Sequence, residues 1–120
     1  MILVIDDEQL IIDLVGQIID LESRTYDLVM VPDMAIKNIK SKKYSIIILD
    51  LHLGMCSGID ILKEIKYSDD SKNKQTPVYI MSGLIKEHEQ KEIEGLIEGI
   101  IPKPFEIDDI AKIVTNDQGE

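Results

Sequence analysis

The sequence has 120 residues, of which 44% are hydrophobic and 30% charged, so it suits one globular domain spanning residues 1–120 and excludes a disordered chain. A formal net charge of −10 at pH 7 argues against nucleic-acid binding, which depends on Lys and Arg neutralising phosphates. No apolar run has the length of a membrane span, the N-terminus lacks the pattern of a signal peptide, and the single cysteine, Cys56, excludes an internal disulfide. We therefore expect a cytoplasmic protein that binds neither nucleic acid nor membranes.

The first half of the chain alternates short apolar runs with amphipathic segments, which predicts strands and helices in turn. Strands are expected at residues 1–5 and 26–31, and helices at residues 10–21 and 34–41. The first helix is predicted from apolar residues spaced three and four apart: Leu10, Ile11, Leu14, Val15, Ile18 and Leu21. Pro32 is expected to stop the second strand, and Asp33 to be the N-cap of the next helix.

The second half opens with four consecutive apolar residues, 46–49, followed by a carboxylate at Asp50. A run this short and β-branched predicts a strand buried on both faces. Gly58 is expected to open a helix, and the polar residues 67–76 predict a surface loop. The remaining elements are expected to be a strand at 77–82, a helix at 85–94, a strand at 99–102 and a helix at 107–114.

Five strands alternating with five helices through short connections predict a parallel sheet covered on both faces. Right-handed crossovers leave few topologies, and the commonest at this size is the flavodoxin-like order 2-1-3-4-5. We therefore expect an α/β fold, a flavodoxin-like (βα)5 three-layer sandwich. Pro102 indicates that the fifth strand lies at an edge, because proline cannot donate to a sheet ladder.

Five polar residues follow the carboxyl ends of the predicted strands, where open α/β sheets bind ligands: Asp6, Asp7, Asp50, Ser82 and Lys103. Each alone has an ordinary explanation, such as a helix cap, a turn residue or a surface lysine. The first and third strands are expected to be neighbours, so the three carboxylates should cluster and repel one another unless a cation joins them. Mg²⁺ prefers oxygen ligands, and a central carboxylate beside it can attack phosphorus. Lys103 and Ser82 could then donate to the phosphoryl oxygens.

In combination these residues resemble the receiver domain of response regulators in bacterial two-component signalling, over essentially the whole chain. The resemblance rests on a glycine and four short motifs: Gly58, Val4-Ile5-Asp6-Asp7-Glu8, Ile47-Ile48-Leu49-Asp50-Leu51, Pro77-Val78-Tyr79-Ile80-Met81-Ser82-Gly83 and Pro102-Lys103-Pro104-Phe105.

The resemblance implies that Asp50 is the phosphoacceptor and that Mg²⁺ is the cofactor. Asp7 and Asp50 would bind the metal directly, and Asp6 would act mainly through water. The third protein ligand would be the backbone carbonyl of His52.

The resemblance also implies how the phosphate would be held. Ser82 would be the switch hydroxyl that moves onto the phosphate, and Lys103 the lysine that pairs with it. The Lys103–Pro104 peptide bond is expected to be cis, as is usual at this turn.

Three positions depart from the family pattern or lie where the family tunes its chemistry. Ile100 stands three residues before the lysine, where the family usually has an aromatic residue whose rotamer is coupled to the switch. His52 and Leu84, two residues after Asp50 and Ser82, resemble positions that set the rate of dephosphorylation. His52 could orient water, block it or simply point to solvent.

The expected function is therefore that of a signalling switch rather than a conventional enzyme. Phosphate would pass from a histidine kinase or a histidine phosphotransfer domain to Asp50, and the surface of the fourth helix, fifth strand and fifth helix would change to regulate a downstream protein or an output domain. No output domain is expected in this chain, and a phosphorylation-linked homodimer is left open.

Three alternatives remain at this point. A degenerate receiver could be a scaffold that is never phosphorylated, and the replacement at Ile100 favours that reading. An aspartate-nucleophile phosphohydrolase would carry a second aspartate where this chain has His52. A flavodoxin-type cofactor binder would need a phosphate loop after the first strand, where Asp6 and Asp7 would repel a phosphate.

Overall fold

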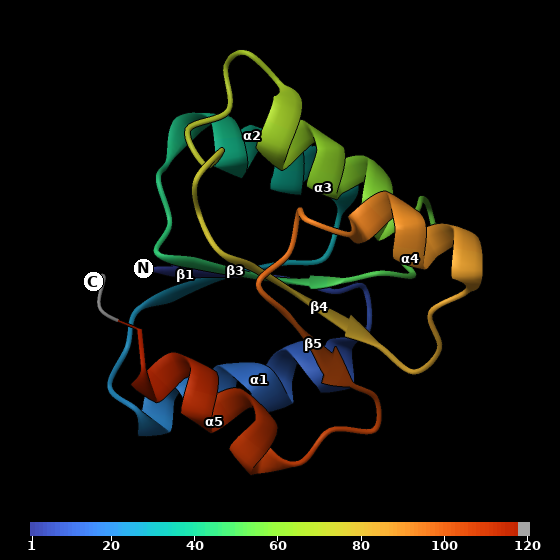
Figure 1. The fold of residues 1–120 in the computed structure, drawn as a ribbon. Helices are drawn as coiled ribbons and strands as arrows, with labels where there is room; N and C mark the ends of the chain where they lie inside the picture. Colours follow the sequence, from blue (N-terminus) through green and yellow to red (C-terminus); the bar gives the residue numbers. More distant parts are fainter. Residues whose placement is uncertain (118–120) are drawn as a thin grey trace.

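A parallel sheet of five strands forms the centre of the molecule (Figure 1). The computed structural model describes residues 1–117 and orders the strands β2-β1-β3-β4-β5, which confirms the predicted order 2-1-3-4-5. β5 lies at one edge, as Pro102 indicated. The strands are β1 (Ile2–Ile5), β2 (Tyr26–Val29), β3 (Ile46–Asp50), β4 (Val78–Ser82) and β5 (Gly99–Pro102).

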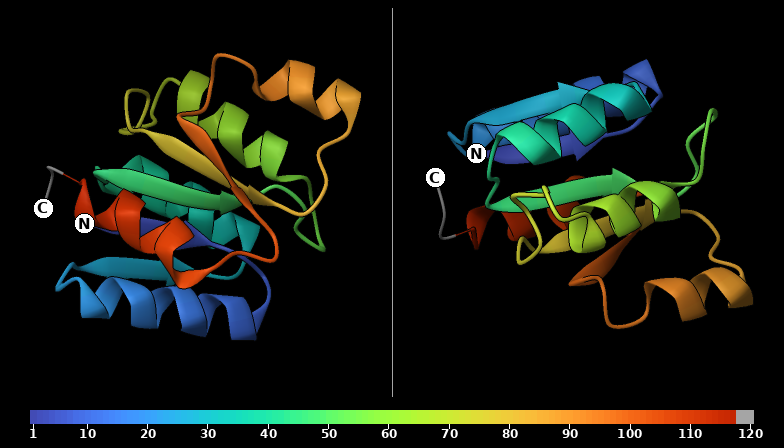
Figure 2. Two further views of the ribbon diagram at one scale, coloured as in Figure 1. Left: turned by 60° about the horizontal axis from the view of Figure 1, so that its bottom comes forward. Right: turned by 90° about the horizontal axis from the view of Figure 1, so that it is seen from above.

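Five helices cover the two faces of this sheet and complete the predicted three-layer sandwich (Figure 2). α1 and α5 lie against one face, and α2, α3 and α4 lie against the other (Figure 1). Among the described residues, no helix combines the length and the apolar character needed to cross a bilayer. The helices are α1 (Gln9–Leu21), α2 (Pro32–Ser41), α3 (Gly58–Tyr67), α4 (Glu87–Ile93) and α5 (Ile107–Thr115).

The central strands have apolar side chains on both faces, because each face is covered by helices. In β1, Ile2 and Val4 pack in the cluster with α1 and α5, whereas Leu3 and Ile5 pack in the cluster with α2 and α3. All four side chains are 0% exposed. Burying an aliphatic side chain fully contributes about 1.5–3 kcal/mol, so these clusters fix the sheet that carries the polar strand ends.

The buried face of α1 differs from the predicted one. Leu10 and Leu21 are 82% and 77% exposed, whereas Ile12 and Ile19, which the predicted apolar stripe left out, are buried. The helix has apolar residues on more than one face, so their spacing alone could not select the stripe that meets the sheet.

The start of α2 also differs from the prediction. β2 ends at Val29, two residues earlier than expected, and Pro32 is the first helical residue. Asp33 therefore lies in the first turn of the helix and is not its N-cap, a position taken by Val31. Proline suits the first helical position because its missing N–H would have no partner there, and Asp33 still favours the helix through the dipole.

The polar segment 67–76 is only partly the surface loop that was expected. Asn73 is 0% exposed and Thr76 is 3% exposed. Asn73 Oδ1 accepts the N–H of Tyr44 at 2.7 Å, and its Nδ2 donates to the carbonyls of Ile39 and Lys42 at 2.8 and 2.7 Å. Thr76 Oγ1 lies 3.1 Å from the Tyr44 carbonyl and 3.0 Å from Asn73 Oδ1. This cluster, Asn73 with Thr76, ties the loop before β4 to the segment that enters β3.

We expect Asn73→Ala to lower the free energy of unfolding by about 3 kcal/mol, because several buried backbone groups would lose their partners together. Urea unfolding followed by circular dichroism would measure the change. Gln75→Ala, at an exposed position in the same loop, is the matched control and should change the free energy by less than about 0.5 kcal/mol. Equal effects of the two substitutions would contradict the anchoring role of Asn73.

Candidate phosphoacceptor site

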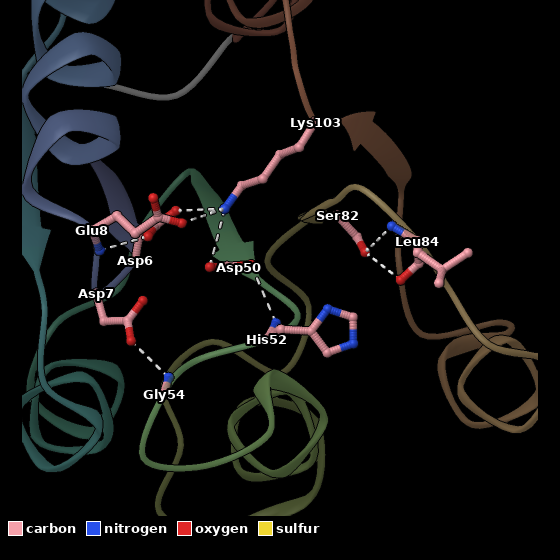
Figure 3. Close-up of polar contacts among 9 residues, drawn as sticks. All are labelled: Asp6, Asp7, Glu8, Asp50, His52, Gly54, Ser82, Leu84 and Lys103. Atoms are coloured by element: carbon pink, nitrogen blue, oxygen red, sulfur yellow. Dashed lines mark hydrogen bonds and ion pairs between the residues drawn. The ribbon is translucent and has the colours of Figure 1, made fainter.

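The register of the sheet brings the polar strand ends together at its carboxyl edge. Ile5 of β1 pairs with Leu49 of β3, so Asp6 comes level with Asp50. On the other side of β3, Asp50 pairs with Met81, the residue before Ser82. Ser82 in turn pairs with Pro102, the residue before Lys103. All five predicted site residues therefore lie along one edge (Figure 3).

Three carboxylates form the centre of this edge. Oxygen atoms of Asp6, Asp7 and Asp50 lie within 4.8 Å of one another, as the topology predicted. Asp6 and Asp50 are 0% and 3% exposed, whereas Asp7 is half-buried. Their partners hold them in place: Asp6 Oδ1 accepts the N–H of Glu8 at 2.9 Å, and Asp7 Oδ2 accepts the N–H of Gly54 at 2.6 Å.

Lys103 brings a positive charge into the cluster from β5. Its ammonium nitrogen lies 3.1 Å from Asp50 Oδ2 and 3.2 Å from Asp6 Oδ2, and 3.9 Å from Glu8 Oε1 (Figure 3). Burial of this ammonium acts to lower its pKa, but the adjacent carboxylates of Asp50 and Asp6 outweigh it, so the pKa of Lys103 is raised. The lysine thus stays charged. The peptide bond that follows it, Lys103–Pro104, is cis, as expected.

The carboxylates still exceed the positive charge available to them. Burial, together with the charge of Asp50, raises the pKa of Asp6, although the Glu8 N–H and Lys103 act in the opposite direction. The three clustered aspartates and Lys103 together carry a net charge of −2 when all four groups are ionised, before the nearby Glu8 is counted. An all-oxygen donor set of this charge, partly open to water at Asp7, fits the ligand preference of Mg²⁺.

Gly58 allows the loop after Asp50 to fold back closely on β3. Its N–H donates to the Leu51 carbonyl at 2.7 Å. A Cβ atom at this position would meet the Asp50 carbonyl oxygen and would lie 2.8 Å from Leu51 Cα, a distance that real Cβ atoms do not adopt. A side chain here would therefore displace the backbone of the acceptor residue, which explains the glycine in physical terms.

Ser82 is placed near the site, but its hydroxyl is turned away from it. Oγ donates to the Leu84 carbonyl at 2.8 Å and lies 3.2 Å from the Leu84 N–H, so the side chain points toward its own loop (Figure 3). Leu84 itself is 70% exposed. The Ser82 hydroxyl could donate to a phosphate on Asp50 only after its hydrogen bond to the Leu84 carbonyl has broken.

His52 has a partner that no local sequence pattern indicates. Its Nε2 lies 2.9 Å from Glu89 Oε2, so the ring is held and does not simply point to solvent. Glu89 belongs to α4, a helix of mostly polar residues, yet it is only 6% exposed. The N–H of Lys86, and then the His52 ring, hold the pKa of Glu89 below its usual value. Burial of a glutamate on a seven-residue polar helix leaves no signal in the sequence.

Comparison with known families identifies the class of protein that carries such an edge. The family described as response regulator receiver domain matches residues 2–115, and this chain belongs to that family. The identification confirms the resemblance drawn from the motifs. Receiver domains are generally signalling modules rather than conventional enzymes.

Individual relatives agree with this assignment. The receiver domain of NtrX from Brucella abortus is 27% identical, with a TM-score of 0.76 over 96% of this chain and 98% of that one. The receiver domain of the sensor histidine kinase PA1611 from Pseudomonas aeruginosa, whose structure has magnesium coordinated in its active-site cleft, is 16% identical, with a TM-score of 0.83 over 99% and 97% of the two chains.

A curated relative is a much larger protein. The protein-glutamate methylesterase/protein-glutamine glutaminase of Treponema denticola is 31% identical over 88 residues, which are 72% of this chain but 23% of the relative. The chain thus spans less than a quarter of that protein's length, and the activities in its name belong to that protein.

We expect Asp6→Asn to change how stability depends on pH in the absence of divalent cations. The folded pKa of Asp6 is raised, so the wild type loses stability as pH rises from the unfolded aspartate pKa, near 3.9, through the folded value. Asp6→Asn lacks this loss. Between pH 3 and pH 7 its free energy of unfolding should therefore rise, relative to that of the wild type, by on the order of 1 kcal/mol. Urea unfolding in EDTA at several pH values would measure it. Parallel pH curves for the two proteins would contradict the raised pKa.

Proposed function

We propose that this protein is a phosphoryl-accepting signalling switch whose acceptor is Asp50. The observation that carries the proposal is the placement of Asp50 between two other carboxylates and the ammonium of Lys103 at the carboxyl edge of the sheet. Burying a carboxylate beside two others costs stability through desolvation and like-charge repulsion, which favours a chemical role for Asp50 over a structural one. Membership of the receiver family supports the same role.

The transfer we propose starts from a phosphohistidine of a histidine kinase or a histidine phosphotransfer domain. A carboxylate oxygen of Asp50 attacks phosphorus, the P–N bond breaks, and the imidazole nitrogen keeps the electron pair and takes up a proton. The new P–O bond gives an acyl phosphate on Asp50. Lys103, already 3.1 Å from the carboxylate, would pair with the incoming phosphoryl oxygens.

We propose Mg²⁺ as the cofactor, held by Asp7, Asp50 and the backbone carbonyl of His52, with Asp6 acting through water. The metal supplies charge neutralisation and orientation for the phosphoryl group. The three clustered carboxylates support this choice, and the magnesium in the Pseudomonas aeruginosa receiver provides a precedent in that protein.

After transfer, Ser82 would exchange its bond to Leu84 for one to the phosphoryl group. The loop that joins β4 to α4 would move with it, and the α4–β5–α5 surface would change to regulate a downstream protein or an output domain. We propose that the chain acts as a single receiver domain in the cytoplasm, where its kinase would reach it.

Incubation with acetyl phosphate and Mg²⁺ should add one phosphoryl group to the wild-type protein and none to Asp50→Asn. Intact mass spectrometry measures the adduct directly. Asp60→Asn, which removes an exposed carboxylate of α3 and leaves the site intact, is the matched control and should be modified like the wild type.

Two other outcomes would each reject the proposal. Absence of any adduct, together with no response to beryllofluoride, would leave a scaffold that shares the fold. Continued release of phosphate from many phosphorylated substrates would instead indicate a phosphohydrolase, even though His52 stands where such enzymes have a second aspartate.

Mg²⁺ should stabilise the folded protein without any phosphodonor. At a concentration 100 times its Kd, the gain in the free energy of unfolding should be about 2.7 kcal/mol for one site that binds only the folded state. Asp7→Asn should lose most of this gain, whereas Asp60→Asn should keep it. Equal stabilisation of both variants would indicate that the ion binds elsewhere.

A further inference from the structure

His52 contacts both the acceptor residue and α4. Its backbone N–H donates to Asp50 Oδ1 at 3.2 Å, and its ring Nε2 lies 2.9 Å from Glu89 Oε2. Figure 3 shows the backbone nitrogen directed at Asp50 and the ring directed away from it. One residue therefore joins the centre of the site to a helix on the surface.

Glu89 uses its two carboxylate oxygens for two different purposes. Oε2 meets the His52 ring, and Oε1 accepts the N–H of Lys86 at 2.9 Å, which closes the first turn of α4. The residue is 6% exposed, so loss of either partner would leave a buried carboxylate oxygen without compensation. The start of α4 is thus attached to the loop that follows Asp50.

α4 has few other attachments. Glu89 and Ile93 are its only buried residues, and they lie near the two ends of the helix. The pair Lys63–Glu92 joins it to α3 at 3.2 Å, but both side chains are exposed and such pairs contribute little. An element with so few buried contacts can change position at low cost, so the contact at Glu89 has a large share in where its N-terminal end lies.

The resemblance to receiver domains implies an aromatic residue on β5 that is coupled to the switch. Ile100 stands on β5 where the family has a switch aromatic, and its aliphatic side chain is 45% exposed. Ile100 therefore supplies no aromatic ring at this position. The contact between His52 and Glu89 instead connects the loop at Asp50 to α4.

We propose that the His52–Glu89 pair couples the state of Asp50 to the position of α4 in this protein. A phosphoryl group on Asp50 changes the acceptor oxygen that His52 N–H contacts, so the His52 backbone shifts and carries its ring, and with it Glu89 and the first turn of α4. Glu89 is a positioning residue and does not touch the phosphoryl group. The coupling is reciprocal, so a partner that holds α4 would also bias the loop at Asp50. This inference rests on the proposed phosphorylation of Asp50.

Backbone amide NMR with Mg²⁺ and beryllofluoride, a mimic of the phosphoryl group, would test the coupling separately from binding. In the wild type, amides of residues 50–54 and of α4 should both shift. In Glu89→Gln, which keeps an oxygen for the Lys86 N–H, the site amides should shift as in the wild type, whereas shifts in α4 should fall at least twofold. His88→Ala, on the exposed side of the same helix, is the matched control and should behave like the wild type.

His52→Ala breaks the same contact from the other side and leaves the bond between Glu89 and Lys86 in place. It should also reduce the α4 shifts at least twofold, and it decides the question if Glu89→Gln folds poorly. Undiminished α4 shifts in folded His52→Ala, which has no ring to contact Glu89, would overturn the coupling. If the wild-type site amides did not respond at all, the proposed phosphorylation would fail, and the coupling with it.

Discussion

The repulsion among three carboxylates at the carboxyl edge of the sheet is the constraint on which this molecule's behaviour depends. Asp6 and Asp50 are almost completely buried beside Asp7, and Lys103 supplies a positive charge that pairs with both of them. The fold tolerates this arrangement because the aliphatic clusters on both faces of β1 and β3 are large enough to hold the strands in register. The folded protein therefore carries a local excess of negative charge, which is the feature on which the proposed binding of Mg²⁺ and the proposed phosphoryl transfer depend.

Most of the architecture could be predicted from local patterns. The runs that became β1, β3 and β4 are short, β-branched and followed by polar residues, so the parallel sheet and its order followed from few assumptions. The clustering of Asp6, Asp7 and Asp50 then followed from topology alone, because strands 1 and 3 had to be neighbours. These features depend on period and order, which a sequence records directly.

What could not be predicted depends on contacts between distant segments. Asn73 lies in a polar run, and only the fold brings it beside Tyr44 and Ile39, where its amide satisfies buried backbone groups. Glu89 similarly has a polar helical neighbourhood, and its burial arises from the loop that carries His52. On α1, apolar residues on several faces left the buried stripe undetermined until the sheet was in place. In each case the local pattern indicated the element correctly but did not indicate which distant segment would pack against it.

The Asn73–Thr76 cluster has a consequence for how change is distributed along the strands. It sits at the amino end of the sheet, where Asn73 and Thr76 bind the backbone of the segment that enters β3. The carboxyl end holds the clustered carboxylates of Asp6, Asp7 and Asp50 and the exposed loop residue Leu84. The two ends of the sheet therefore differ. Hydrogen bonds tie the loops together at the amino end, whereas like charges lie close together at the carboxyl end. Under the proposed function, phosphorylation of Asp50 would reshape loops and α4 at one end while the other end preserves the register of the sheet, so a signal would not cost the protein its fold.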